Sequence, residues 1–272
     1  MARDVGFDDT ALSYAAAEDG PLKQAVIQLI ERWSGQARVD RIYREVRGSL
    51  RPEDNIWAAA VASMGLTATY SEAQLAAVPR HGPLVVVANH PFGVVDGLLL
   101  CHLVSMVRSD FKVVAMSTLC RVSEVRDHVL PINFAGTPEA VAISARSRRA
   151  ARSLLSRGGC LVIFPAGGVS TSRSLFGRAA DLDWHPFAGR LILSHEAAVL
   201  PVRFEGQNSR LFHWVSRFSQ TLRLSLLLRE AVCRMGTEID MRVGETLPFE
   251  ALRGFKDPKA LVQHLRTMTY AL

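Results

Sequence analysis

The fold is decided at Leu84-Val85-Val86-Val87-Ala88, an unbroken apolar run that directly follows Pro83. A continuous run of this kind is typical of a strand buried on both faces, because helices cover both sides of a parallel sheet. Similar runs recur further along the chain, at 111–116, 129–134, 160–164 and 199–204, and a more alternating one lies at 239–243. The sequence therefore predicts several buried strands.

Helical patterns separate these strands, at 97–107, 138–155 and 188–197. Alternation of strands and helices at this spacing predicts an α/β fold: an open, mostly parallel sheet flanked by helices. Before the first strand, helical spacing of apolar residues predicts three helices, at 21–33, 39–46 and 56–64. We expect a helical N-terminal lobe over residues 1–75 and an α/β domain over residues 76–272, together forming one compact unit.

Composition narrows the classes of protein. The chain has 272 residues, 49% of them hydrophobic, and 32 Lys and Arg against 26 Asp and Glu. This excludes a disordered chain and provides for a sizeable core. No stretch of 18 apolar residues predicts a spanning helix, and the acidic first nine residues do not resemble a signal peptide. Four scattered cysteines without a C-x-x-C pair predict no metal site and a reducing, cytoplasmic compartment.

The turn after the first strand reads Asn89-His90-Pro91-Phe92-Gly93-Val94-Val95-Asp96-Gly97. A glycine within it permits a sharp bend, which would fold His90 back against Asp96. A carboxylate on one imidazole nitrogen fixes the tautomer and makes the other nitrogen a better base. The alternative is structural: Asp96 caps the next helix and His90 is an ordinary loop residue.

A second loop, after the strand at 160–164, reads Pro165-Ala166-Gly167-Gly168-Val169-Ser170-Thr171-Ser172-Arg173. Small residues expose backbone N–H groups, which bind a phosphate or a developing oxyanion. The loop lacks the Gly-Lys-Ser/Thr of a nucleotide-binding loop and the second glycine of a nucleophile elbow. By itself it indicates an anion-binding turn and no particular reaction.

Taken together, the two loops resemble the glycerolphosphate (lysophospholipid) acyltransferases. That family has an Asn-His followed by an Asp, and a later Phe-Pro-Glu-Gly-Thr-Arg-Ser, which correspond here to Asn89-His90 with Asp96 and to 164–170. An apolar strand with a central proline, Ala198-Val199-Leu200-Pro201-Val202, matches a further motif. The resemblance covers about 83–206 and is greatest to a bacterial branch often labelled hemolysins, which also shares 206–212.

Three positions depart from the family's pattern. Five residues separate His90 from Asp96 where the family has four, and a bulge at Gly93 would absorb the extra one. Ala166 stands where the family has Glu. Asn133 stands where the family has an Arg for the acceptor's phosphate, so a lyso-aminolipid becomes a credible acceptor.

The resemblance implies transfer of a fatty acyl group from acyl-CoA or an acyl carrier protein to a lyso-lipid hydroxyl, with no bound cofactor or metal. It implies His90 and Asp96 as the catalytic pair. We predict substrate-binding roles for Asn89, Gly93, Gly167, Gly168, Ser170 and Arg173. Two alternatives remain open: a non-catalytic lipid-binding protein on the same scaffold, and a hydrolase using Ser170 or Ser172 with His90.

Arginines predict where anions bind. Arg146, Arg148, Arg149, Arg152 and Arg157 form either a solvated helix face or a landing site for CoA phosphates, an acidic carrier protein or anionic lipid. The basic, aromatic stretch at 208–235 is either a core-packing helix pair or a membrane-docking segment. In the second case Phe212, Trp214 and Phe218 are wedges, and Arg210, Arg217 and Arg223 contact lipid phosphates. No nucleic-acid motif is present, so we expect no nucleic-acid partner. Because a lipid acceptor stays in the bilayer and no spanning helix is predicted, we expect a protein peripheral to the inner face of the cell membrane.

Overall fold

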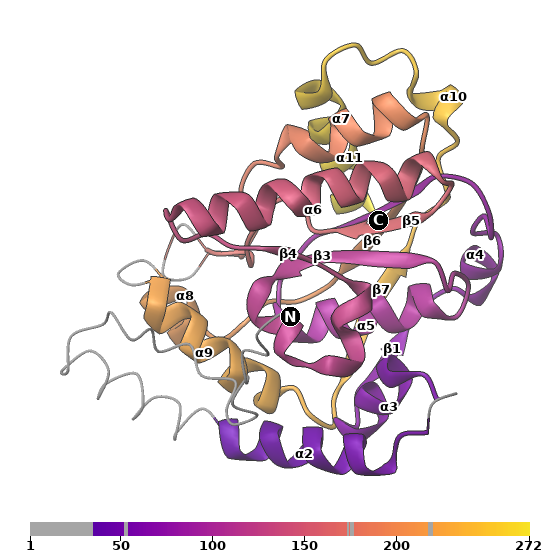
Figure 1. Cartoon of the computed structure of the whole chain (residues 1–272). Helices are drawn as coiled ribbons and strands as arrows, with labels where there is room; N and C mark the ends of the chain where they lie inside the picture. Colours follow the sequence, from indigo (N-terminus) through magenta and orange to yellow (C-terminus); the bar gives the residue numbers. More distant parts are fainter. Residues whose placement is uncertain (1–34, 52–53, 173, 175–176, 217–219) are drawn as a thin grey trace.

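The computed structural model describes residues 35–51, 54–172, 174, 177–216 and 220–272 (Figure 1). These residues build one seven-stranded sheet in the order β1-β7-β6-β2-β5-β3-β4. The strands are β1 Thr67–Thr69, β2 Leu84–Ala88, β3 Phe111–Met116, β4 Val129–Ile132, β5 Cys160–Ile163, β6 Ala198–Phe204 and β7 Glu238–Val243. Neighbouring strands are parallel except for the antiparallel pair β6 and β7. The predicted open, mostly parallel sheet is confirmed.

The central strand β2 shows why the apolar runs are continuous. All five of its residues are completely buried. Val86 packs into the core on one face of the sheet, whereas Val85 and Val87 pack into the core on the other. Each such valine contributes about 1.5–3 kcal/mol by burial, so both faces of the strand have to be apolar.

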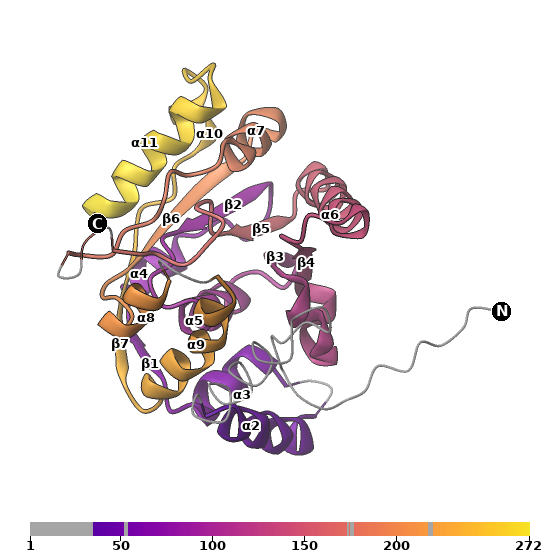
Figure 2. The same ribbon diagram turned by 90° about the vertical axis from the view of Figure 1, so that its left-hand side faces the viewer.

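Helices cover both faces (Figure 2). One layer holds α2 Gln36–Ser49, α3 Ile56–Ser63, α5 Val94–Ser105, α8 Arg210–Val215 and α9 Gln220–Cys233. The other holds α6 Pro138–Ser156, α7 Pro186–His195 and α11 Pro258–Ala271. Shorter elements are α4 Glu72–Ala76, α10 Phe249–Leu252 and two 3-10 helices, Ser117–Arg121 and Ser123–His128.

Within the described residues, the predicted helices are present with boundaries that differ by up to three residues, and one of these differences affects the site. The helices expected at 39–46 and 56–64 are present as α2 and α3, and the one expected at 21–33 lies outside the described residues. Helix α5 was expected from Gly97 but begins at Val94, because Gly93 has a φ of 85° and reverses the chain just before it. Asp96 therefore lies inside the first helical turn, and the alternative in which it caps the helix is wrong.

The N-terminal region is helical but also supplies a strand. β1 pairs in parallel with β7 and so extends the sheet at its edge. The division into a lobe at 1–75 and a domain at 76–272 stays a prediction.

Arg108 closes the end of the sheet where the parallel strands begin. Its side chain is completely buried, and its guanidinium holds Asp110 through two bonds of 2.7 and 2.8 Å. Further bonds reach the carbonyl oxygens of Pro79, Gly82 and Gly158. These loops lead into β2, β3 and β5, so one side chain ties together three strand entries. The hydrogen bonds from Arg108 lower the pKa of the Asp110 carboxyl.

Candidate active site

The turn between β2 and α5 brings His90 and Asp96 together. Nδ1 of His90 lies 3.1 Å from Oδ1 of Asp96. Asp96 is fully buried and accepts hydrogen bonds of 2.9 Å from the backbone N–H groups of Phe92 and Gly97. The start of the helix thus stabilises the carboxylate and fixes its orientation toward the ring.

Gly93 makes this contact compatible with five intervening residues. Its φ of 85° favours glycine, and a β-carbon added there would lie 2.9 Å from Leu227 and 3.1 Å from Val169. The turn therefore passes close beneath α9. The extra residue is accommodated while the two side chains remain in contact.

The His90 ring is held on its flat face as well as at its edge. It stacks on Phe164, with centroids 4.0 Å apart and planes inclined by 25°. The side chain is 18% exposed, and Nδ1 lies toward Asp96. Nε2, on the opposite edge of the ring, is therefore the nitrogen available to a substrate proton. The Nδ1 contact is not aligned as a straight hydrogen bond, as is common before substrate binds.

Asn89 joins the ends of two strands. Its amide donates to the carbonyl of Phe204 at 2.9 Å, and its side-chain oxygen accepts from the N–H of Phe204 at 2.7 Å. These bonds fix the end of β2 beside the end of β6. The amide is occupied in this way, and its expected contact with substrate stays a prediction.

The loop after β5 attaches directly to the turn between β2 and α5 that carries His90 and Asp96. Ser170 donates its backbone N–H to the carbonyl of His90 at 2.7 Å, and Gly167 has a φ of 69°. The backbone N–H groups of Gly168 and Val169 have no acceptor among the described residues. Two donors thus lie in a loop that is bonded to the candidate base.

Asp181 is a buried carboxylate that the sequence did not single out. Its Oδ1 accepts from the His90 backbone N–H at 3.1 Å and from the Ser170 hydroxyl at 2.5 Å. Its Oδ2 accepts from Trp184 at 2.9 Å, and its own N–H donates to the Tyr270 hydroxyl at 2.9 Å. Burial, with a smaller contribution from the Asp181 charge, raises the pKa of Tyr270. Asp181 therefore positions both loops.

The environment of Ser170 weighs against a serine nucleophile. Its hydroxyl is buried and donates to Asp181, and the Ser172 hydroxyl donates to the carbonyl of Ser174. Neither hydroxyl contacts His90 among the described atoms, although a nucleophile and its base need that contact. Arg173 lies outside the described residues.

Comparison with known proteins identifies the family of the chain. A family model described as "Acyltransferase" matches residues 24–272. The chain belongs to this acyltransferase family. A lyso-glycine lipid O-acyltransferase of Phocaeicola vulgatus is 23% identical over 203 residues, covering 72% of this chain and 70% of that protein. The crystal structure of the 1-acyl-sn-glycerophosphate acyltransferase PlsC from Thermotoga maritima covers 92% of this chain and 94% of its own, at 14% identity and a TM-score of 0.49.

Over the stretch 208–235 the acyltransferase has a helix pair packed into its core. Phe212 is completely buried and contacts Val169, Leu226 and Leu227, so the expectation that it projects as a surface wedge is wrong. Trp214 is 51% exposed, whereas Arg217 and Phe218 lie outside the described residues.

Two arginines of this stretch that are predicted to contact lipid phosphates lie within the described residues. Arg223 lies toward the loop after β5, where its Nη2 donates to the carbonyl of Val169. Arg210 is exposed at the start of α8. A contact of Arg210 with lipid phosphate stays a prediction.

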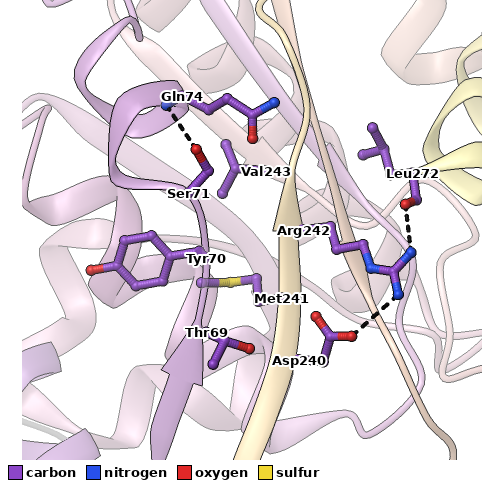
Figure 3. A pocket seen from close by; sticks show the side chains of 9 residues that line it. All are labelled: Thr69, Tyr70, Ser71, Gln74, Asp240, Met241, Arg242, Val243 and Leu272. Carbon is purple, nitrogen blue, oxygen red and sulfur yellow. Dashed lines mark hydrogen bonds and ion pairs between the residues drawn. The ribbon is translucent and has the colours of Figure 1, made fainter.

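Two hollows of the acyltransferase lie away from His90. One, of about 420 Å³, lies between β1 and β7 and is lined by residues such as Tyr70, Asp240 and Arg242 (Figure 3). The other, of about 430 Å³, lies on α6 beside Arg146 and Arg149. Strands β7 and β6 lie between β1 and β2, the strand that leads to His90, so this hollow is near the edge of the sheet. We assign no chemistry to the hollow in Figure 3.

The arginines of α6 are exposed, as expected for either interpretation of them; they are Arg146, Arg148, Arg149, Arg152 and Arg157, the last being the residue after the helix. Among the described residues, no group of three or more His, Cys, Asp or Glu is arranged to hold a metal ion. No helix in the described part of the chain is long and apolar enough to cross a bilayer.

Proposed function

We propose that this acyltransferase moves a fatty acyl group from a thioester donor, acyl-CoA or acyl carrier protein, to the hydroxyl of a lyso-lipid. The observation that carries the proposal is the contact of 3.1 Å between the half-buried His90 ring and the buried Asp96 carboxylate. The relative that acts on a lyso-glycine lipid supports a lyso-lipid acceptor. No cofactor takes part in the proposed step.

The reaction requires one proton to be moved twice. Nε2 of His90 takes the proton of the acceptor hydroxyl as its oxygen attacks the thioester carbonyl, and Asp96 stabilises the imidazolium that forms. The carbonyl oxygen becomes an oxyanion, which the backbone N–H groups of Gly168 and Val169 are available to stabilise. When the carbon–sulfur bond breaks, the leaving thiolate recovers the proton from His90. The ester and the free thiol are the products.

Replacement of His90 by alanine tests this proposal. We expect turnover of a responsive lyso-lipid to fall by about 10²–10⁴-fold, the usual effect of losing a general base. The matched control is His195→Ala, a histidine on the far helix layer, which should leave turnover unchanged. Turnover of His90→Ala within about threefold of wild type would contradict the assignment. Lipid binding without turnover by the wild type, with both donors supplied, would instead favour the non-catalytic alternative.

We further propose that the enzyme works on the membrane surface, at the inner face of the cell membrane, with α8 as the contact. Leu211 and Trp214 are 44% and 51% exposed on this short helix, and Arg210 is exposed beside them. Apolar and cationic side chains on one surface segment suit an anionic bilayer. Helix α8 also packs on α9, which lies over the catalytic turn, so contact there would bring the lipid to His90.

A further inference from the structure

Arg223 contacts the loop after β5 from helix α9, whereas His90 contacts it from the turn after β2. It lies one turn before Leu227 on α9, so the two side chains share a helix face. Leu227 lies over Gly93, and Nη2 of Arg223 would lie 3.7 Å from a β-carbon at Gly168. The guanidinium donates to the carbonyl of Val169 and lies 5.8 Å from the Phe212 ring centroid. It is therefore at the rim of the loop that is bonded to His90.

The charge of Arg223 is not neutralised by the protein that the structure describes. No described Asp or Glu lies within ion-pair distance of it, and one backbone carbonyl is its recorded acceptor. None of its other nitrogens is both buried and unpaired, so these donors reach solvent. Burial lowers the pKa of the guanidinium, which still leaves it a cation at neutral pH. A half-buried cation without a counter-charge is costly, and an anionic ligand would offset that cost.

The loop itself carries no substitute for this charge. Ala166 and Asn133 occupy the two positions where the family resemblance implies Glu and Arg. The loop residues from Gly167 to Ser170 are all uncharged. An acceptor with an anionic head group, placed with its hydroxyl at His90, would find in Arg223 a cation that is bonded directly to the loop.

We propose that Arg223 binds the anionic head group of the acceptor lipid, a carboxylate or a phosphate, and so selects the acceptor. This rests on the proposed function, whose acceptor it specifies. A guanidinium presents paired N–H donors that match both oxyanions, and bonds to charged groups are the stronger ones. Because Val169 occupies part of Nη2, the remaining edge of the fork is the one offered to the ligand.

Binding measured in a catalytically disabled enzyme tests the role without turnover. In the His90→Ala background, the ligands are an N-(3-hydroxyacyl)glycine, its uncharged glycinamide counterpart, and lysophosphatidic acid. Adding Arg223→Gln should weaken binding of at least one anionic ligand by about 10- to 100-fold and change the glycinamide by less than about threefold. Arg223→Lys should retain part of the affinity, because it keeps the charge without the fork.

The control variant replaces an exposed arginine on α7. Arg190→Gln should change none of the affinities. Equal weakening of the charged and uncharged ligands by Arg223→Gln, with an unchanged melting temperature, would mean that Arg223 only supports the loop, which overturns the inference. If Arg223→Gln does not fold, Arg223→Lys decides: equal effects on glycine and glycinamide ligands overturn the inference in the same way.

A turnover assay in the His90-containing enzyme separates this failure from failure of the proposed function. Arg223→Gln should raise the KM for the anionic acceptor more than it lowers kcat. A wild type that binds anionic lyso-lipids through Arg223 but acylates none of them would overturn the proposed function and leave the binding site standing. A wild type that acylates the glycine and glycinamide acceptors with equal kcat/KM would overturn the inference alone.

Discussion

The two ends of the same sheet each hold an arginine, one fully buried and one half-buried, in opposite ways. At the end where the parallel strands begin, Arg108 is 2% exposed and is satisfied by one carboxylate and three backbone carbonyls. At the end where they finish, Arg223 has one recorded carbonyl acceptor and no described carboxylate. The first arrangement is complete without a ligand, whereas the second has donors to spare. The comparison predicts that the first end serves stability and the second serves binding.

Exposed apolar side chains follow the same division. Most of the large ones lie on segments that come after the carboxyl ends of strands: Val94, Phe134, Val141, Leu182, Leu211 and Trp214. Met106, at the other end of α5, is the exception among those described. Ligands of open α/β sheets bind at the carboxyl ends of strands, so apolar surface there is suited to a lipid.

The comparison predicts its largest effect on stability at Arg108. Arg108→Met should lower the free energy of unfolding by about 3–5 kcal/mol, because Asp110 and the carbonyls that enter three strands lose their donor. Denaturant unfolding measures this, and Arg80→Met, an exposed neighbour, is the control. The folded fraction should keep its kcat. A loss of kcat without a loss of stability would break the division between the two ends.

Asp181→Asn should have a smaller effect on stability and a clear one on activity. An amide retains one of the two oxygens that accept from His90, Ser170 and Trp184, so we expect a loss of about 1–3 kcal/mol in unfolding free energy. Because both loops shift slightly, kcat should fall about tenfold. The matched control is the exposed Asp183→Asn. An unchanged kcat would show that Asp181 serves the fold without positioning the site.

The smallest effect concerns the membrane. Trp214→Ala should weaken co-sedimentation with phosphatidylcholine–phosphatidylglycerol vesicles by about three- to tenfold, since about half of a large apolar side chain is available for burial. Met106→Ala removes an exposed apolar side chain at the opposite end and should leave sedimentation unchanged. Equal effects from the two variants would show that apolar exposure at the carboxyl end is not specific for lipid.

The sequence predicts what depends on neighbours in the chain. Apolar runs predict β2 and β3 with their observed bounds. The glycine-containing turn between β2 and α5 predicts the contact between His90 and Asp96. Helix α11 was not predicted, although an Asp257 cap and a buried face were there to be read from Leu261 and Leu265.

What the sequence does not give is pairing between distant segments. No spacing rule relates Asp181 to His90, and its one local signal is Trp184 three residues later. The inward direction of Arg223 and the burial of Phe212 depend on how α8 and α9 fold back over the turn. A basic, aromatic segment looks the same in sequence whether it faces lipid or core.

Gly93 has a consequence for how such a site can change over time. The turn passes close beneath Leu227, since a β-carbon at Gly93 would lie 2.9 Å from the end of that side chain, so the turn and the leucine are packed against each other. A side chain at Gly93 would be strained by the φ of 85° and would press on Leu227 unless that leucine changed as well. A relative with a different number of residues between its histidine and aspartate could therefore not supply this turn alone. The exchange would have to include the turn between β2 and α5 together with helix α9 above it.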